Sequence, residues 1–287
     1  MLTYPNIDPI AIHLGTWHLF GHVFNPAIHW YGITYLVGFI GGYWLARGRI
    51  KRMAGWTETQ LQDLLFYVAM GVVLGGRVGY TLFYDFRGFL HDPVSFFYVW
   101  NGGMSFHGGL LGVMAAMWLF GRVYQRRFFE LMDFISPLVT IGLGAGRLGN
   151  FINGELWGKV SDLPWAMRLN CADGRFAYYC DGATSGWSAP HHPSQLYEFI
   201  LEGVVMFSVL WWFSSKQRPP MAVSGLFALL YGVFRFLVEF VRMPDAQLGY
   251  LAFGWLTMGQ ILSLPLILTG IVLMWLAYRR SGAERAA

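Results

Sequence analysis

The side chains with the greatest chemical potential in this chain gather in the run G-R-L-G-N-F-I-N-G-E-L-W-G, residues 146–158. The run places Arg147, Asn150, Asn153 and Glu155 where a long apolar stretch ends. Charged and amide groups are costly in hydrocarbon, so a cluster of them at membrane depth indicates a functional site.

The composition indicates an integral membrane protein. Of 287 residues, 55% are hydrophobic, 18% are aromatic and only 13% are charged, which is too little polar surface to cover a soluble protein of this size. The net charge of +4 does not indicate a nucleic-acid partner, because the basic residues lie in short loops between apolar segments.

Seven apolar segments each have about the length that a helix needs to cross roughly 30 Å of hydrocarbon. They are residues 27–46, 61–84, 103–121, 131–151, 196–214, 222–242 and 255–278. We therefore expect an all-α fold with seven transmembrane helices, forming a single membrane domain over residues 1–287.

The Lys and Arg residues predict the orientation. Twelve of the twenty follow the first, third, fifth and seventh segments, and the positive-inside rule makes that side cytoplasmic. The N-terminus is then outside, the C-terminus is cytoplasmic, and residues 152–195 form a small extracytoplasmic head. Cys171 and Cys180 lie in this head, where a disulfide can persist. A local staple is favoured over a metal site, because their spacing matches no zinc pattern.

Other polar side chains fall near the outer ends of the segments: His29, Tyr31, Arg77, His107, Glu198, Glu202, Arg235, Glu239 and Arg242. Each alone has a structural explanation, such as an arginine that reaches the headgroups or a histidine that caps a helix. Several arginines from different helices at one depth instead predict a site for an anion, since guanidinium groups match phosphate oxygens. A phosphate held at this depth suggests a phospholipid. Nearby, Ser194 follows Pro193 and is expected to cap the fifth helix.

These residues carry a resemblance to a known family. The run 146–158 resembles the signature of the bacterial phosphatidylglycerol:prolipoprotein diacylglyceryl transferases. The likeness extends to H-W-Y-G at 29–32, G-G-M-S-F-H-G-G at 102–109, H-P-S-Q-L-Y-E at 192–198 and R-F-L-V-E-F-V-R at 235–242. It covers nearly the whole chain apart from residues 160–190.

The resemblance implies a multi-pass enzyme of the bacterial inner membrane with its active site toward the outer leaflet. Such an enzyme moves the diacylglyceryl group of phosphatidylglycerol to the lipobox cysteine in the signal peptide of a preprolipoprotein. A thioether forms and glycerol phosphate leaves, which is the first step of lipoprotein maturation. The partners implied are these two substrates and membrane lipids. The family's important positions correspond here to Tyr31, His107, Arg147, Asn150, Glu155, Gly158, Arg235 and Glu239.

Within this reading, the catalytic candidates are His107 as the base that raises the thiolate fraction, and Arg147 and Arg235 as the groups that stabilise the departing phosphate. Glu155 and Glu239 are expected to orient the two guanidiniums. The substrate-binding candidates are Tyr31, His29, Arg77, Asn150, Asn153, Glu155, Gly158, Glu239 and Arg242. No metal or other cofactor is expected, since no ligand spacing is present.

Two other classes of protein stay open at this point. A transporter or channel would also place Arg and Glu in a multi-helix bundle, although here the charges gather near one face. A serine hydrolase would use Ser105 or Ser194 with His107, although neither serine lies in a G-x-S-x-G context.

Overall fold

The structure is a computed structural model that describes residues 2–19, 22–51, 55–98, 103–180, 186–244 and 249–286. Arg52, one of the twelve basic residues that predict the orientation, and Gly102, the first residue of the run 102–109, lie outside the described residues. The chain forms two compact units, one of residues 1–42 and 136–287 and the other of residues 43–135. The boundaries fall inside two helices, α1 (Trp30–Ile50) and α5 (Phe128–Asn153).

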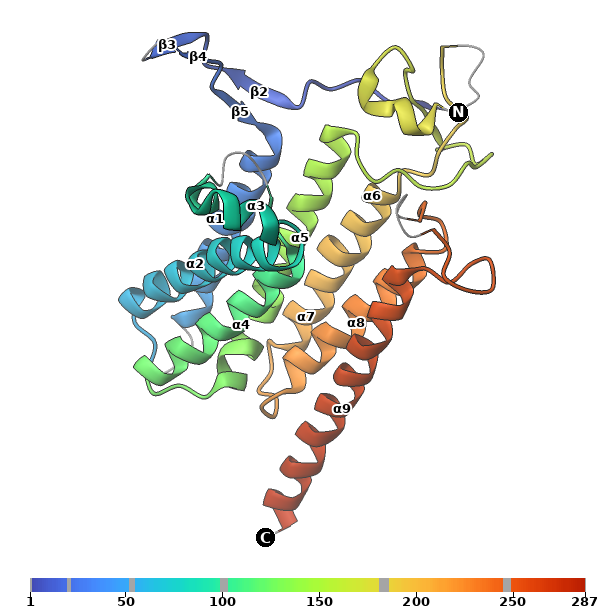
Figure 1. Cartoon of the computed structure of the whole chain (residues 1–287). Helices are drawn as coiled ribbons and strands as arrows, with labels where there is room; N and C mark the ends of the chain where they lie inside the picture. Colours follow the sequence, from blue (N-terminus) through green and yellow to red (C-terminus); the bar gives the residue numbers. More distant parts are fainter. Residues whose placement is uncertain are drawn as a thin grey trace. The chain divides into compact units, whose positions relative to one another are not determined.

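The unit of residues 43–135 is built on two helices, α2 (Glu58–Phe83) and α4 (Phe106–Val123), which pack along each other (Figure 1). Glycines make this close approach possible: a Cβ added at Gly75 would lie 2.4 Å from the carbonyl oxygen of Gly108. Between these helices the chain forms the short helix α3 (Phe86–His91) and the 3₁₀ turn η1 (Pro93–Phe97).

The larger unit contains the first part of α1, most of α5, a continuous helical run and two helices that follow it. A continuous helical run consists of α6 (Ser194–Glu198), the π-helical segment η4 (Phe199–Val205) and α7 (Met206–Phe213). It is followed by α8 (Ala222–Val238) and α9 (Met258–Ala286), which pack along each other (Figure 1). Glycines again mark the closest backbone contacts, where Gly38 of α1 meets Gly142 and Gly144 meets Gly203.

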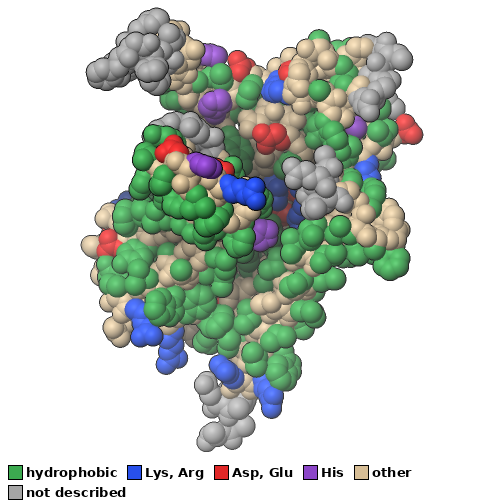
Figure 2. Space-filling view, viewed as in Figure 1, with side chains coloured by type: hydrophobic (Ala, Val, Ile, Leu, Met, Phe, Trp, Pro, Cys, Tyr) green, Lys and Arg blue, Asp and Glu red, His purple; other side chains and the backbone are tan. Residues whose placement is uncertain are grey.

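Each apolar segment of the sequence coincides with a helix or a helical run, so the mostly helical architecture is as expected. Within the described residues, four helical segments are long and apolar enough to cross a membrane, namely Glu58–Phe83, Phe128–Asn153, Ser194–Phe213 and Met258–Arg280. Large apolar side chains such as Trp44, Trp212 and Leu268 are more than 60% exposed. Hydrophobic side chains cover much of the helical surface in Figure 2, as expected of a protein whose solvent there is lipid.

Residues 152–195 are joined by the N-terminal segment to form the head. Strand β1 (Leu2–Thr3) pairs in parallel with β6 (Met167–Arg168), an addition to the all-α expectation. Tyr4 is buried against Trp157 and Phe176, and its single hydroxyl proton is directed at the carbonyl oxygens of Phe151 and Ile152, which lie 2.9 and 2.7 Å from the hydroxyl oxygen. The end of α5 is thereby fixed to the head.

Further short strands follow β1 in the N-terminal segment. Strand β2 (Ile10–His13) pairs with β5 (Ala27–His29), and β3 (Trp17–Leu19) pairs with β4 (His22–Phe24), both antiparallel. Strand β5 leads directly into α1.

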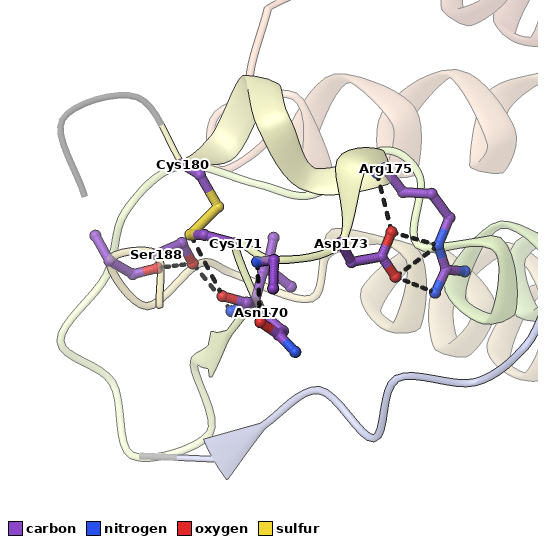
Figure 3. The surroundings of a disulfide bond; sticks show 9 residues. Asn170, Cys171, Asp173, Arg175, Cys180 and Ser188 are labelled. Carbon is purple, nitrogen blue, oxygen red and sulfur yellow. Dashed lines mark hydrogen bonds and ion pairs between the residues drawn. A yellow bond between two sulfur atoms is a disulfide. The ribbon is translucent and has the colours of Figure 1, made fainter. Parts of the chain in front are cut away.

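Cys171 and Cys180 form a disulfide in the head, which confirms the expected local staple (Figure 3). The bond joins the two ends of a turn that contains the 3₁₀ segment η3 (Gly174–Tyr179). Asp173 begins that segment, and its carboxylate accepts hydrogen bonds from the guanidinium of Arg175 (Figure 3). These bonds lower the pKa of Asp173 and keep it charged at neutral pH.

Candidate active site

The signature run begins as the last turns of α5 and then leaves the helix through a glycine turn. The N–H of Gly154 donates to the carbonyl of Phe151, and the N–H of Glu155 donates to that of Asn150, at 3.1 and 2.9 Å. This is a Schellman motif, which requires a left-handed residue after the helix. Gly154 supplies it with φ 74°. The polar residues of the run are therefore held at a defined helix end.

Arg147 and Arg235, from α5 and α8, are brought together by one carboxylate. Glu198 of α6 contacts Nη1 of Arg147 through Oε2 at 3.1 Å and Nη1 of Arg235 through Oε1 at 2.7 Å. Glu202 of η4 adds a contact of 3.0 Å to Nε of Arg147, and Glu239 one of 2.9 Å to Nη2 of Arg235. We call Arg147, Glu198, Glu202, Arg235 and Glu239 the ion-pair cluster.

The ion-pair cluster is buried unequally. The side chains of Glu198 and Glu202 are fully buried, whereas those of Arg147 and Arg235 keep 16% and 17% of their surface exposed. The accessible part of the ion-pair cluster is therefore on the arginine side chains and not on these two carboxylates. Each guanidinium has five N–H donors, so both retain donors beyond those used in the ion pairs. Such an arrangement can hold an anion while the carboxylates keep the two buried positive charges compensated.

The carboxylates that contact the arginines are only partly those expected. Glu239 contacts Arg235 as expected, but Glu155 contacts neither guanidinium in the structure. Its carboxylate is exposed and accepts hydrogen bonds from the side-chain amides of Asn150 and Asn153, at 3.1 and 3.3 Å. The physical reason is the Schellman turn, which brings Glu155 back over the end of its own helix.

Glu198 and Glu202, which the sequence analysis placed near the outer end of the fifth segment but did not name as site candidates, make the contacts with the arginines that were expected of Glu155. Their signal was present: two carboxylates four residues apart in an apolar helix need buried cations as partners. No pattern in the sequence predicted the π-helical segment that carries Glu202. Such segments occur often at functional sites.

Gly158 joins the signature run to the end of α8. Its backbone forms a bridge with Arg242, and the N–H of Lys159 donates to the carbonyl of Val241 at 2.8 Å. A Cβ on Gly158 would lie 2.5 Å from that same carbonyl oxygen, so only glycine fits. This pairing also ends α8 at Val238, whereas the expected segment ran to residue 242.

Arg242 therefore lies beyond the helix rather than on the helical face shared with Arg235. Its Nη1 is still 3.5 Å from Oε1 of Glu198, and the residue is buried. A third guanidinium thus lies at the edge of the ion-pair cluster.

His29 directly precedes α1, and Tyr31 lies in the first turn of this helix. The ring of Tyr31 packs where a Cβ on Gly149 would be, at 2.9 Å, so Tyr31 lies against the signature helix. Its hydroxyl is 3.1 Å from that of Tyr35. His29, at the end of β5, is exposed. Tyr31 is thus beside the signature run, and His29 lies on the adjoining strand.

His107 and Arg77 belong to the other unit. His107 is exposed in the first turn of α4, which Ser105 caps by accepting from the N–H of Gly108 at 3.2 Å. Arg77 is buried and donates to the carbonyls of Ser95, Phe96 and Gly103. These contacts give Arg77 a structural role in fixing the segment that precedes α4.

The hydroxyl groups of the two serines considered as nucleophiles both form hydrogen bonds with backbone groups. Ser105 caps α4, and Ser194 donates to the carbonyl of Leu156 at 2.6 Å. The expectation that Ser194 caps the fifth helix is wrong, because Pro193 occupies the cap position and the hydroxyl is used in the signature run. Within the described residues, no group of His, Cys, Asp and Glu has the arrangement of a metal site.

Comparison with known proteins identifies the family. The family model for prolipoprotein diacylglyceryl transferase matches residues 19–276. A phosphatidylglycerol–prolipoprotein diacylglyceryl transferase of Ectopseudomonas mendocina is 58% identical over 288 residues, covering all of both chains. Proteins of the same name from Pseudomonas aeruginosa and Azotobacter vinelandii are 57% and 58% identical, with coverage of 100% and 98% of both chains. The chain therefore belongs to the prolipoprotein diacylglyceryl transferase family.

Proposed function

We propose that this protein transfers the diacylglyceryl group of phosphatidylglycerol to the lipobox cysteine of preprolipoproteins. The observation that carries the proposal is the identity of 57–58%, over essentially full length, to relatives whose name gives the lipid donor, the acceptor protein and the group transferred. The ion-pair cluster supports it independently, because it presents two guanidiniums of the kind that hold a phosphate.

The reaction exchanges one bond for another at a single carbon. The cysteine sulfur attacks the carbon of the diacylated glycerol that carries the phosphate. A carbon–sulfur bond forms, and the bond between that carbon and the phosphate oxygen breaks. The electron pair of that bond leaves with glycerol phosphate, and the thiol proton passes to a base and then to solvent or the leaving group. Diacylglyceryl-cysteine and glycerol phosphate are the products.

Negative charge grows on the phosphate as the carbon–oxygen bond breaks. Arg147 and Arg235 act on that charge, since fixed cations in a site with little water stabilise a transition state without reorganising. Glu198, Glu202 and Glu239 hold the guanidiniums in position. Asn150 and Tyr31 donate hydrogen bonds to phosphate or glycerol oxygens, and Arg242 and Asn153 complete the polar surroundings.

His107 is the base in this proposal. A free cysteine thiol has a pKa of about 8.5 and is only slightly ionised at neutral pH, so a base is needed. Imidazole titrates close to physiological pH and suits this role. Exposure of His107 at the start of α4 leaves it open to a substrate thiol.

The apolar helices and the basic loops support the membrane arrangement that we propose. All seven helical segments cross the bacterial inner membrane, with the N-terminus and the head outside and the C-terminus in the cytoplasm. The ion-pair cluster then lies toward the outer leaflet. Both the lipid donor and a signal peptide reach it from within the membrane.

The direct test uses purified protein, phosphatidylglycerol vesicles and a peptide with a lipobox cysteine. We expect the peptide to gain the mass of a diacylglyceryl group, with release of an equal amount of glycerol phosphate. A peptide with serine in place of the cysteine is the control. Release of glycerol phosphate without modification of the peptide would instead indicate a lipid hydrolase, and solute flux without either product would indicate a transporter.

A further inference from the structure

The carboxylate of Glu239 is held by the beginning of α9, a helix to which the mechanism above assigns no role. Glu239 directly follows the last residue of α8. Its two oxygens have different partners. Oε2 contacts Nη2 of Arg235 at 2.9 Å, and Oε1 accepts a hydrogen bond from the hydroxyl of Thr257 at 2.9 Å. Thr257 therefore fixes the rotation of the carboxylate that faces Arg235.

Thr257 is in turn fixed by a reciprocal cap. Its Oγ1 accepts from the N–H of Gln260 at 3.3 Å, while Oε1 of Gln260 accepts from the N–H of Thr257 at 3.1 Å. This is a capping box. A hydroxyl has a single proton to donate, and because the cap uses Oγ1 as an acceptor, that proton is available for Glu239.

The space around the carboxylate is equally specific. A Cβ on Gly259 would lie 2.7 Å from Oε1 of Glu239, so the absence of a side chain lets the carboxylate rest against the first turn of α9. The first turn of a helix carries partial positive charge and favours a carboxylate. Thr257, Gln260 and Glu239 are 2%, 0% and 4% exposed, so water does not compete for these bonds.

We propose that Thr257, supported by Gln260 and Gly259, is a positioning residue for catalysis: it orients Glu239, and through Glu239 the Arg235 guanidinium that meets the phosphate. This inference rests on the proposed transferase function. The hydroxyl itself touches no reacting atom. Its loss leaves Glu239 free to rotate, and Arg235 then loses its fixed direction toward the leaving group.

The experiment measures kcat and KM for phosphatidylglycerol in the peptide assay for Thr257→Val and Thr257→Ser. Misplaced charge acts chiefly on the transition state, so we expect Thr257→Val to lower kcat about ten- to hundredfold with KM changed less than about threefold. Thr257→Ser keeps the hydroxyl and should stay within about threefold of wild type in both constants.

Thr57→Val is the matched control, because Thr57 caps α2 through the N–H of Gln60 in the same T-x-x-Q pattern. It loses a helix cap without affecting the ion-pair cluster, so its kcat should stay close to that of wild type. Gly259→Ala is a second variant, in which the added Cβ presses on Glu239 while the hydroxyl of Thr257 is kept, and kcat should again fall.

Several results would overturn the inference: a kcat for Thr257→Val within twofold of wild type, equal loss in the serine variant, a loss confined to KM, or an equal loss in Thr57→Val. A wild-type kcat in Gly259→Ala would also overturn it, even if Thr257→Val failed to fold. Failure of the wild-type protein itself to modify the peptide is a different result, since it would contradict the proposed function.

Discussion

Single residues of the site depend on neighbours that lie deeper in the protein. Arg147 and Arg235 are mostly buried, and the fully buried carboxylates of Glu198 and Glu202 compensate the charge that burial would otherwise leave unpaired. The sequence was sufficient to select both arginines. It was not sufficient to pair them, because pairing depends on which carboxylates the folded helices bring within about 3 Å, and Glu155 turned out to be held by asparagines.

His107 gives a prediction at the residue scale. In His107→Gln the base is lost, so turnover at neutral pH should fall by about 10² to 10⁴. The loss should shrink at high pH, where more of the substrate thiol is ionised without help. The measurement is the pH profile of kcat between about pH 6 and 9, and a loss of equal size at every pH would show that His107 binds substrate instead.

His192, in the head, predicts how stability depends on pH. Burial lowers its pKa, and the neighbouring His191 and Lys159 act in the same direction. The unfolded chain, with the ordinary value of about 6.5, therefore binds more protons just below that pH. Stability is complete above about pH 6.5 and declines as the pH falls toward the lower folded-state pKa. Thermal unfolding in detergent should show a smaller acid-induced decline for His192→Gln than for wild type.

His91→Gln is the control for this comparison, since His91 is exposed at the end of α3. Its stability should decline with acid as that of wild type does. Parallel stability curves for wild type and His192→Gln would refute the assignment.

At the scale of elements, backbone pairing connects the head to the helices. The segment beginning at Gly158 lies between the segment of His192 and the end of α8, with hydrogen bonds of 2.8 Å to each side. The helix positions were predictable from apolar length alone. The end of α8 was not, because a backbone bridge between Gly158 and Arg242 terminates it, and such pairing has no signature in a local sequence.

Gly158→Ala should disrupt this connection. The added Cβ would lie 2.5 Å from the carbonyl oxygen of Val241, so the end of α8 has to shift and Arg242 shifts with it. We expect transfer to fall at least tenfold. Gly146→Ala is the matched control within the same signature, since a Cβ there meets no atom within 4 Å. Equal activity of the two variants would refute this role for Gly158.

At the scale of the whole molecule, the amino-acid composition indicated a membrane protein, and the positions of Lys and Arg predicted its orientation. The short strands and the participation of the N-terminus in the head were not predictable, because Tyr4 and β1 find their partners more than 140 residues away. The sequence favoured a disulfide between Cys171 and Cys180, which lie in one polar loop, but did not decide it, and the structure joins them.

Topology provides the prediction at this scale. Green fluorescent protein fused after the C-terminus should fluoresce in cells, whereas alkaline phosphatase at the same place should be inactive, because basic residues lie at the C-terminal end of α9 and the positive-inside rule predicts that this end is cytoplasmic. Alkaline phosphatase inserted in the head should be active. The reverse pattern would contradict the proposed orientation.

The most direct test of the central claim is the transfer rate of Arg235→Lys and Arg147→Lys with phosphatidylglycerol and the lipobox peptide. Lysine keeps the charge but loses the planar fork that contacts Glu198 and that, in the proposed reaction, also binds the phosphate. With Arg218→Lys as control, we expect kcat in each site variant to fall by about 10² to 10³ while the thermal unfolding temperature stays near that of wild type. Near-normal kcat in either variant would contradict the claim that the paired guanidiniums stabilise the departing phosphate.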